Sequence, residues 1–175
     1  MLKLPVSNDD HIQGKKNAPI TFVEYGDYEC PFCGNAYLII KQVQEHFGTN
    51  LRFVFRNFPL TEIHPLAKSA AYFAEFAGSQ GLFWEMHDLI YENQASLSME
   101  LLFKLAESLA LSSKKLKDAL AKQLFEQKIQ NDFISGVKSG VNGTPTLFIN
   151  DYRYPGPVEF EDLVSAISEM VKIKT

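Results

Sequence analysis

The sequence predicts an α/β protein in which two strand-and-helix halves flank an all-helical segment. Three observations carry this prediction. A buried strand at residues 20–25 leads into an amphipathic helix, every signal between residues 65 and 139 is helical, and strand patterns return after Gly140 and Gly143. The chain of 175 residues is long enough to bury a substantial core.

The first half reads as strand, helix and strand. Residues 20–25 are apolar on both alternating faces apart from Glu24, which is typical of a central strand covered on both sides. Residues 31–47 have helical apolar spacing, and Gly48 ends that helix. Residues 51–58 alternate as a second strand. A crossover of this kind makes the two strands parallel.

The middle of the chain predicts a helical block of about four elements. Apolar stripes mark two helices between residues 65 and 91. Ser98 is placed to cap a third helix, and Ser112 or Ser113 to cap a long fourth helix that continues through Leu124.

Strands and one helix close the chain. Residues 146–149 predict a short strand, Asn150 and Asp151 a turn, and residues 152–154 an antiparallel return. A final amphipathic helix begins near Phe160. Because a tight hairpin is antiparallel and the earlier crossover is parallel, the sheet must be mixed.

This order divides the chain into a core and an insertion. We predict a core from residues 1–62 and 140–175, with an inserted helical subdomain at residues 63–139.

The chain has two cysteines, Cys30 and Cys33, and the two-residue gap between them is the spacing of a redox-active dithiol. They lie where the first strand passes into the first helix, and Pro31 suits a first helical turn. Unpaired N–H groups and the helix dipole favour a thiolate there, with pKa values lowered to roughly 3.5 to 7.5. We therefore expect Cys30 to be the exposed nucleophile and Cys33, one turn deeper, to resolve the mixed disulfide.

A zinc half-site and a pair of inert core thiols are the alternative interpretations. A structural zinc site needs four ligands, and neither a second cysteine pair nor finger-like histidine spacing exists here. Inert thiols would be favoured if no strand preceded them. We thus predict no metal and no bound cofactor, because the Cys30–Cys33 disulfide is itself the redox carrier.

Composition narrows the partners and the compartment. A net charge of -4 with 46% hydrophobic residues gives no electrostatic footprint for nucleic acid. No apolar stretch approaches the ~20 residues of a membrane span, and the first residues lack the apolar centre of a secretory signal. We expect a monomer that is cytoplasmic as the chain is written, or periplasmic if a signal peptide has been removed.

Five motifs lie along the chain: EYGDYECPFC at residues 24–33, RNFPL at 56–60, HP at 64–65, FWEMHD at 83–88 and GTPTLFI at 143–149. With them the chain resembles a DsbA-like member of the thioredoxin superfamily over nearly its whole length. The resemblance implies a thioredoxin fold with a mixed central sheet and an inserted all-helical subdomain.

The resemblance also implies roles for individual residues. It implies that Pro145 follows a cis peptide bond and packs against the dithiol, so that the Thr144 backbone meets a peptide partner. Pro31 and Phe32 would contact the same substrate. Glu24 takes the place of a buried acid that moves protons to and from the deeper thiol, whereas the residues alone allow a strand carboxylate satisfied by local hydrogen bonds.

The implied function is a thiol-disulfide oxidoreductase that acts on protein or small thiols and is recharged by an unidentified redox partner. The strongly oxidising branch of the family has a histidine between its cysteines, and this chain has Phe32 there, which leaves the direction of electron flow open. A redox-sensing or peptide-binding module without turnover, and a disulfide isomerase, are the alternatives. We interpret His64 as a structural cap or hinge and His87 as a satisfied, partly buried histidine.

Overall fold

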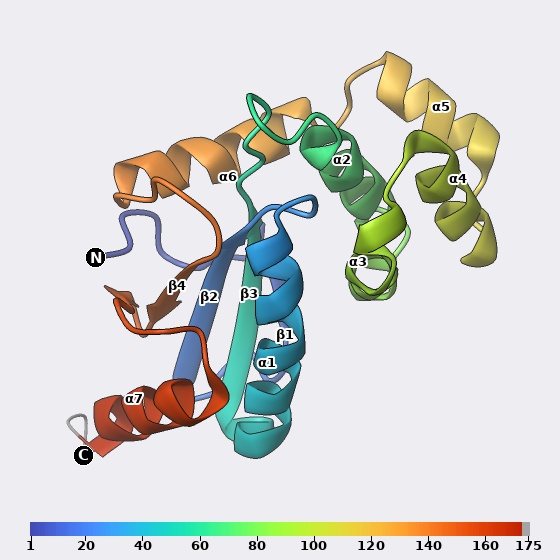
Figure 1. Cartoon of the computed structure of the whole chain (residues 1–175). Helices are drawn as coiled ribbons and strands as arrows, with labels where there is room; N and C mark the ends of the chain where they lie inside the picture. The colour runs from blue at the N-terminus through green and yellow to red at the C-terminus, as the bar shows by residue number, and fades with distance from the viewer. Residues whose placement is uncertain (173–175) are drawn as a thin grey trace.

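The computed structural model describes residues 1–172 and shows a mixed five-stranded sheet with helices on both faces (Figure 1). The strands are β1 (His11–Gln13), β2 (Ile20–Gly26), β3 (Leu51–Asn57), β4 (Thr146–Ile149) and β5 (Tyr152–Arg153). The helices are α1 (Pro31–Phe47), α2 (Ala67–Gly78), α3 (Phe83–Glu92), α4 (Met99–Ser108), α5 (Ser113–Ala121), α6 (Glu126–Lys138) and α7 (Phe160–Lys172), with short 3-10 turns η1 (Gly48–Asn50) and η2 (Gln94–Ser96).

The sheet has the order β1-β3-β2-β4-β5, with β2 at its centre. β2 runs parallel to β3 and antiparallel to β4, so the predicted mixed sheet is confirmed. Asn150 and Asp151 both have positive φ angles, of 46° and 75°, which is the backbone of a two-residue hairpin turn. This turn joins β4 to β5 as the sequence predicts.

Alternation along β2 sorts its side chains onto two hydrophobic clusters. Phe22 packs into the cluster that contains α1 and α7, whereas Val23 and Tyr25 pack on the opposite face, which α6 and the N-terminal segment cover. Since successive strand residues point to opposite faces, Glu24 shares the face of Phe22. The carboxyl group of Glu24 is therefore directed toward the side of the sheet on which α1 lies.

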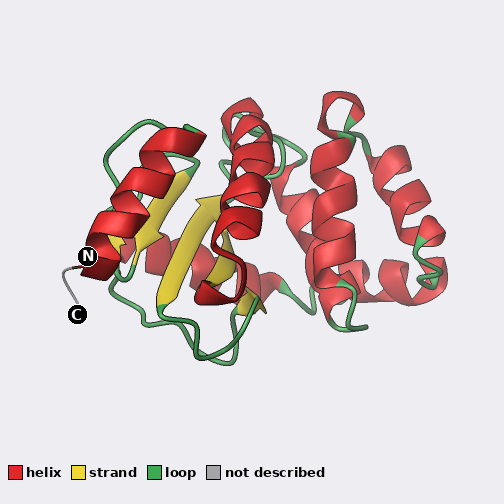
Figure 2. Ribbon diagram, turned by 90° about the horizontal axis from the view of Figure 1, so that it is seen from below, coloured by secondary structure: helices red, strands yellow, loops and turns green. Residues whose placement is uncertain are grey.

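The helical block follows β3 and lies beside the sheet (Figure 2). Helices α2 to α5 group together, and α6 returns across the core, where Phe133 stacks on Phe58 with ring centroids 4.3 Å apart. Ser98 and Ser112 cap α4 and α5 through their hydroxyl oxygens, as expected.

The predicted long fourth helix is wrong, because it is two helices, α5 and α6. Gln123 has a φ of 52°, and the Leu124 N–H bonds back to the Ala119 carbonyl, which is the geometry of a helix stop. Glycine usually occupies that left-handed position, so a glutamine there gives no signal in the sequence. The edge strand β1 is also absent from the sequence prediction, because only its pairing with β3 makes its three residues a strand.

A buried ion pair attaches the N-terminal segment to the sheet. The Arg56 guanidinium, 1% exposed, donates to both carboxylate oxygens of Asp10 at 2.7 and 3.0 Å. It also donates to the Leu4 and Pro5 carbonyls and to the Tyr25 hydroxyl. Burial alone would raise the pKa of Asp10, but the hydrogen bonds and charge of Arg56 hold it below its usual value.

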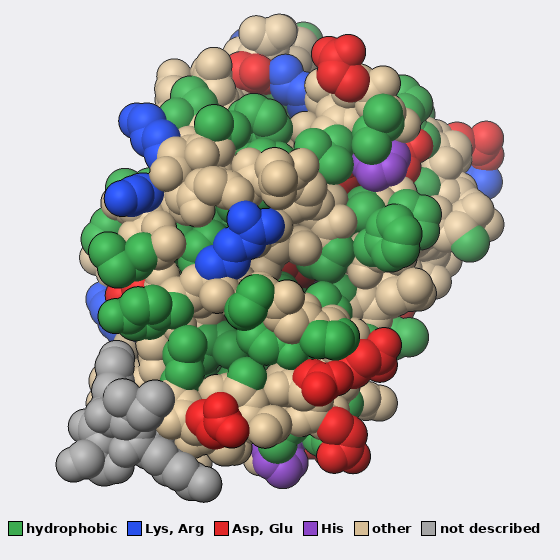
Figure 3. Space-filling model, turned by 60° about the vertical axis from the view of Figure 1, so that its left-hand side comes forward, with side chains coloured by type: hydrophobic (Ala, Val, Ile, Leu, Met, Phe, Trp, Pro, Cys, Tyr) green, Lys and Arg blue, Asp and Glu red, His purple; other side chains and the backbone are tan. Residues whose placement is uncertain are grey.

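One face of the molecule has basic and acidic side chains among apolar ones (Figure 3). Within residues 1–172, no helix combines the length and the apolar character that crossing a bilayer requires.

We predict that Asp10→Ala lowers the free energy of unfolding by about 3 kcal/mol at pH 7, because it leaves the Arg56 charge buried and unpaired. A carboxyl whose pKa is lowered by folding stabilises the native state above its unfolded pKa and loses that effect as pH falls. The difference from wild type should therefore shrink below about pH 4. Urea unfolding at pH 7 and pH 3 measures it, with exposed Asp9→Ala as the control. An equal loss for both variants would contradict the role of the ion pair.

Candidate active site

The two cysteines lie where β2 passes into α1. Cys30 is the N-cap of α1, with Pro31 in the first turn. The Cys30 N–H donates to the Asp27 carbonyl at 3.1 Å, and the Cys30 carbonyl accepts from the Cys33 N–H at 3.0 Å. Both cysteines are free thiols, so this is the geometry of the reduced dithiol.

The shielding of the two sulfurs differs less than expected. Cys33 is 0% exposed, in line with its expected deeper position, but Cys30 is only 4% exposed, so the expectation of an open nucleophile is wrong. The cause is a loop from the other end of the chain, because the Cys30 Sγ lies 3.3 Å from the Thr144 carbonyl oxygen. Phe32, by contrast, is 72% exposed, and Pro31 is exposed beside it.

The Thr144–Pro145 peptide bond is cis, and both residues are half-buried next to the dithiol. The structure thus brings together Cys30, Cys33, Thr144 and Pro145 from segments more than a hundred positions apart. The buried Thr144 hydroxyl has no hydrogen-bond partner within the described residues. It is free to donate to the Cys30 sulfur.

The surroundings shift the pKa values of the two sulfurs in opposite directions. Hydrogen bonding from the Cys33 thiol, with help from Thr144 and the Cys33 and Phe32 N–H groups, lowers the pKa of Cys30 to about 5 against the opposing effect of burial. Burial, followed by the hydrogen bond to Cys30 and the nearby charge of Glu24, raises the pKa of Cys33 well above its usual value. At neutral pH the site therefore holds one thiolate and one thiol.

Glu24 lies on β2, 1% exposed, and its Oε1 atom has no hydrogen-bond partner in the described part of the chain. The sequence alternative of a carboxylate satisfied by local hydrogen bonds is thus not supported for this oxygen. Burial and then the charge of Cys30 raise the pKa of Glu24 to about 8. A cavity of about 10 Å³ adjoins the side chain and lies toward α1, and that volume is close to the space of one water molecule.

Asp27 is a site residue that the sequence analysis missed. Its N–H points at the Cys33 Sγ at 3.4 Å, and its Oδ2 accepts from the Leu60 N–H and from His64 Nδ1, both at 2.8 Å. His64, which precedes the helical block, is therefore also bonded to the dithiol loop through Asp27. Burial by itself would lower the pKa of His64, but the hydrogen bond and charge of Asp27 raise it. Asp27 lies three residues before Cys30, and this closeness in sequence is the signal that would have indicated a contact with the dithiol.

His87 is buried and belongs to an aromatic cluster under the dithiol loop. Its Nδ1 lies 3.0 Å from the Tyr28 hydroxyl, and burial lowers its pKa well below the usual value. It is thus a neutral histidine that supports the loop through Tyr28, close to the interpretation made from the sequence. Within residues 1–172, no three His, Cys, Asp or Glu side chains are grouped so that they could hold a metal ion.

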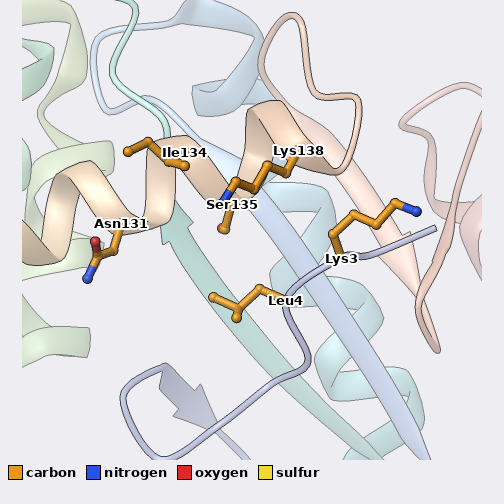
Figure 4. Close-up of a pocket in the computed structure, with 6 residues that line it drawn as sticks. All are labelled: Lys3, Leu4, Asn131, Ile134, Ser135 and Lys138. Atoms are coloured by element: carbon orange, nitrogen blue, oxygen red, sulfur yellow. The ribbon is translucent and has the colours of Figure 1, made fainter.

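Two surface hollows differ in their relation to the site. One, of about 330 Å³, begins at Pro145 and extends along β4 and the segment to Val158. The other, of about 370 Å³, lies between the N-terminal segment and α6 (Figure 4). Lys3, Leu4, Asn131, Ile134, Ser135 and Lys138 line this second hollow, and none of them belongs to the dithiol site.

A family model described as thioredoxin matches residues 6–169. The chain belongs to the thioredoxin family. Within this family it has DsbA-like architecture, because BdbD from Bacillus subtilis in its oxidised form superposes with a TM-score of 0.85 at 27% identity, covering 96% of both chains. Alpha-DsbA1 from Wolbachia pipientis, at 21% identity, shares the fold with a TM-score of 0.84, covering 98% of this chain and 94% of that one.

Curated proteins that match this chain in sequence are named as Na(+)/H(+) antiporters. An Na(+)/H(+) antiporter NhaA 1 from Salinispora arenicola is 43% identical over 168 residues, which are 95% of this chain and 26% of the antiporter. An NhaA 3 antiporter from Salinispora tropica is 41% identical over 167 residues, again 95% of this chain and 26% of the relative. The chain therefore spans about a quarter of the length of the curated relatives it matches.

We predict that iodoacetamide alkylates the reduced protein first at Cys30, with a rate that reaches half its maximum near pH 5, because the thiolate is the reactive form. Cys33 should stay unlabelled until the protein is unfolded. Peptide mapping by mass spectrometry across pH 4 to 9 measures both. First labelling at Cys33, or a midpoint near the usual thiol value, would contradict the assigned roles.

Proposed function

We propose that the chain is a thiol-disulfide oxidoreductase that exchanges disulfides with protein or small thiols through Cys30 and Cys33. The observation that supports it best is the opposite pKa shift of two sulfurs at one helix start, beside Thr144 and Pro145. A stable thiolate is needed for attack, and a protonated, shielded partner is needed so that resolution waits for the mixed disulfide.

The exchange balances with no further reactant. The Cys30 thiolate attacks a substrate disulfide, forms a mixed disulfide and releases one substrate thiolate. Cys33 then loses its proton and attacks the Cys30 sulfur, which closes the Cys30–Cys33 disulfide and releases the second substrate thiolate. Two electrons pass from the dithiol to the substrate. The reverse sequence oxidises a substrate dithiol, and the reduction potential decides the direction.

Glu24 is our proposal for the group that accepts the Cys33 proton. Its charge acts on Cys33, and a carboxyl with a pKa of about 8 is partly ionised at neutral pH, where proton exchange in both directions is efficient. The one-water cavity lies beside the carboxyl on the α1 side. Glu24 therefore fits a proton carrier for the buried sulfur.

A peptide substrate would bind across the dithiol. We propose that the peptide backbone contacts the Thr144 segment and that the peptide side chains enter the hollow that begins at Pro145. The exposed residues Pro31 and Phe32 give apolar contact on the other side of Cys30. The likeness of the fold to BdbD, which has been solved in its oxidised form, supports a redox role for the site. Ion transport is not part of the proposal.

Trapping tests the order of attack. Cys33→Ser should accumulate mixed disulfides with proteins, because attack by Cys30 survives and resolution does not. Cys30→Ser should trap almost none, and wild type should catalyse the reduction of insulin by dithiothreitol. Equal trapping by both variants would refute the order.

The wild-type protein separates the alternative functions. An inert wild type would favour a redox-sensing or peptide-binding module instead, and recovery of activity from scrambled ribonuclease would favour an isomerase.

We predict that Glu24→Gln slows exchange at pH 7 by roughly tenfold or more, because it removes the proton acceptor for Cys33. The variant should gain stability relative to wild type as pH rises from about 5 to about 8, because over that range the unfolded chain has released the Glu24 proton that the native state still holds. Stopped-flow exchange with glutathione and urea unfolding measure the two effects. Exposed Glu45→Gln is the control, and unchanged exchange rates would make Glu24 purely structural.

A further inference from the structure

Gln94 links the helical block to the dithiol loop. It is the first residue of η2, two positions after the end of α3, and lies half-buried against the start of α1. Its Nε2 donates to two backbone carbonyls, those of Tyr28 at 2.8 Å and Cys30 at 2.9 Å. One side-chain amide thus holds the backbone on both sides of Glu29, immediately before the nucleophile's helix.

The other end of the Gln94 amide, its Oε1 atom, packs closely against Gly34 of α1. A Cβ atom at Gly34 would collide with Gln94 Oε1, so a glycine in the first turn of α1 leaves the room that the amide occupies. A side chain at position 34 would therefore displace the amide from the place where it reaches the two carbonyls.

The orientation of the Cys30 carbonyl has consequences for the sulfur. This carbonyl accepts the first hydrogen bonds of α1, from the Cys33 and Gly34 N–H groups. The peptide plane that carries it sets where the first turn begins, and the Phe32 and Cys33 N–H groups of that turn are among the donors that lower the pKa of Cys30. Without Gln94 this carbonyl would keep its two bonds from α1 but lose its third donor, and the N–H groups of the first turn would shift relative to the sulfur.

We propose that Gln94 is a positioning residue for Cys30, which fixes the Tyr28 and Cys30 carbonyls and thereby holds the nucleophilic sulfur over the N-terminal amides of α1. This inference rests on the proposed exchange function, because it assigns part of the reactivity of the same dithiol. It also gives the helical block a direct contact with the reacting end of the core.

Several titratable groups face the same sulfurs and must stay unchanged in the test. Besides the two cysteines they are Glu24 on β2, Asp27 on the loop, His64 before α2 and Tyr91 on α3. Gln94 is uncharged, so its replacement by a neutral side chain leaves all these charges in place. A shift in Cys30 reactivity would then come from geometry.

The test is Gln94→Met, which keeps the length of the side chain and removes its donor. We expect the pH midpoint of Cys30 alkylation by iodoacetamide to rise by about one unit and the dithiol to become more reducing in equilibrium with glutathione. Asn93→Leu is the matched control, because it removes an amide-to-carbonyl bond of similar length, to Leu89, from the neighbouring residue. That variant should leave the midpoint where it is.

A lowered melting temperature with an unchanged midpoint in Gln94→Met would overturn the proposal and make Gln94 a structural link only. If Gln94→Met does not fold, Gln94→Asn, whose shorter amide cannot span to both carbonyls, takes its place with the same expected rise. The proposed function fails separately: a wild-type protein that exchanges neither with glutathione nor with insulin would refute it, while the alkylation midpoints would still decide the role of Gln94.

Discussion

The burial of β2 on both faces is the constraint on which the rest of this structure depends. A central strand with apolar side chains on each face needs helices on both sides, and its two neighbours in the sheet come from opposite ends of the chain. The alternation of the strand then places Glu24 on the α1 face, and its end leads the chain into Cys30. The strand thus determines both where the dithiol lies and which acid lies under it.

The chemistry of the site comes from how hydrogen-bond donors are shared between two sulfurs. The Cys30 sulfur accepts hydrogen bonds from the Cys33 thiol, from Thr144 and from backbone N–H groups. The Cys33 sulfur is instead buried and lies near the charge of Glu24. Burial alone would raise both pKa values, so the donors around Cys30 are what separates the two thiols. The side chain of Phe32 has no hydrogen-bond donor, and the low pKa of Cys30 depends instead on the Cys33 thiol, on Thr144 and on the backbone N–H groups of Cys33 and Phe32.

Polar side chains connect the core to the helical block beneath this site. Asn57, at the end of β3, donates to Glu75 of α2 at 2.7 Å, and its N–H donates to Asp132 of α6 at 3.1 Å. Glu75 in turn lies 2.9 Å from His11 of β1. Buried polar groups lose stability when they lack partners, so these hydrogen bonds favour one placement of the block against the sheet, although the Asn57 Oδ1 atom has no partner within the described residues. The domain boundaries given from the sequence remain a prediction, and α6 in particular packs on the core.

The sequence by itself determined the features that arise from neighbours along the chain. The limits of α1, the cap at Ser98, a cap at Ser112 or Ser113 and the hairpin at Asn150 all follow from local periodicity, capping and turn chemistry. Tertiary structure alone decided the rest. The break at Gln123, the strand β1, the cover over Cys30 and the contacts of Asp27 and Gln94 each join segments that are distant in sequence or use a residue without a local preference. Such contacts form only when the chain has folded, because a single side chain carries no information about the partner that the fold will bring to it.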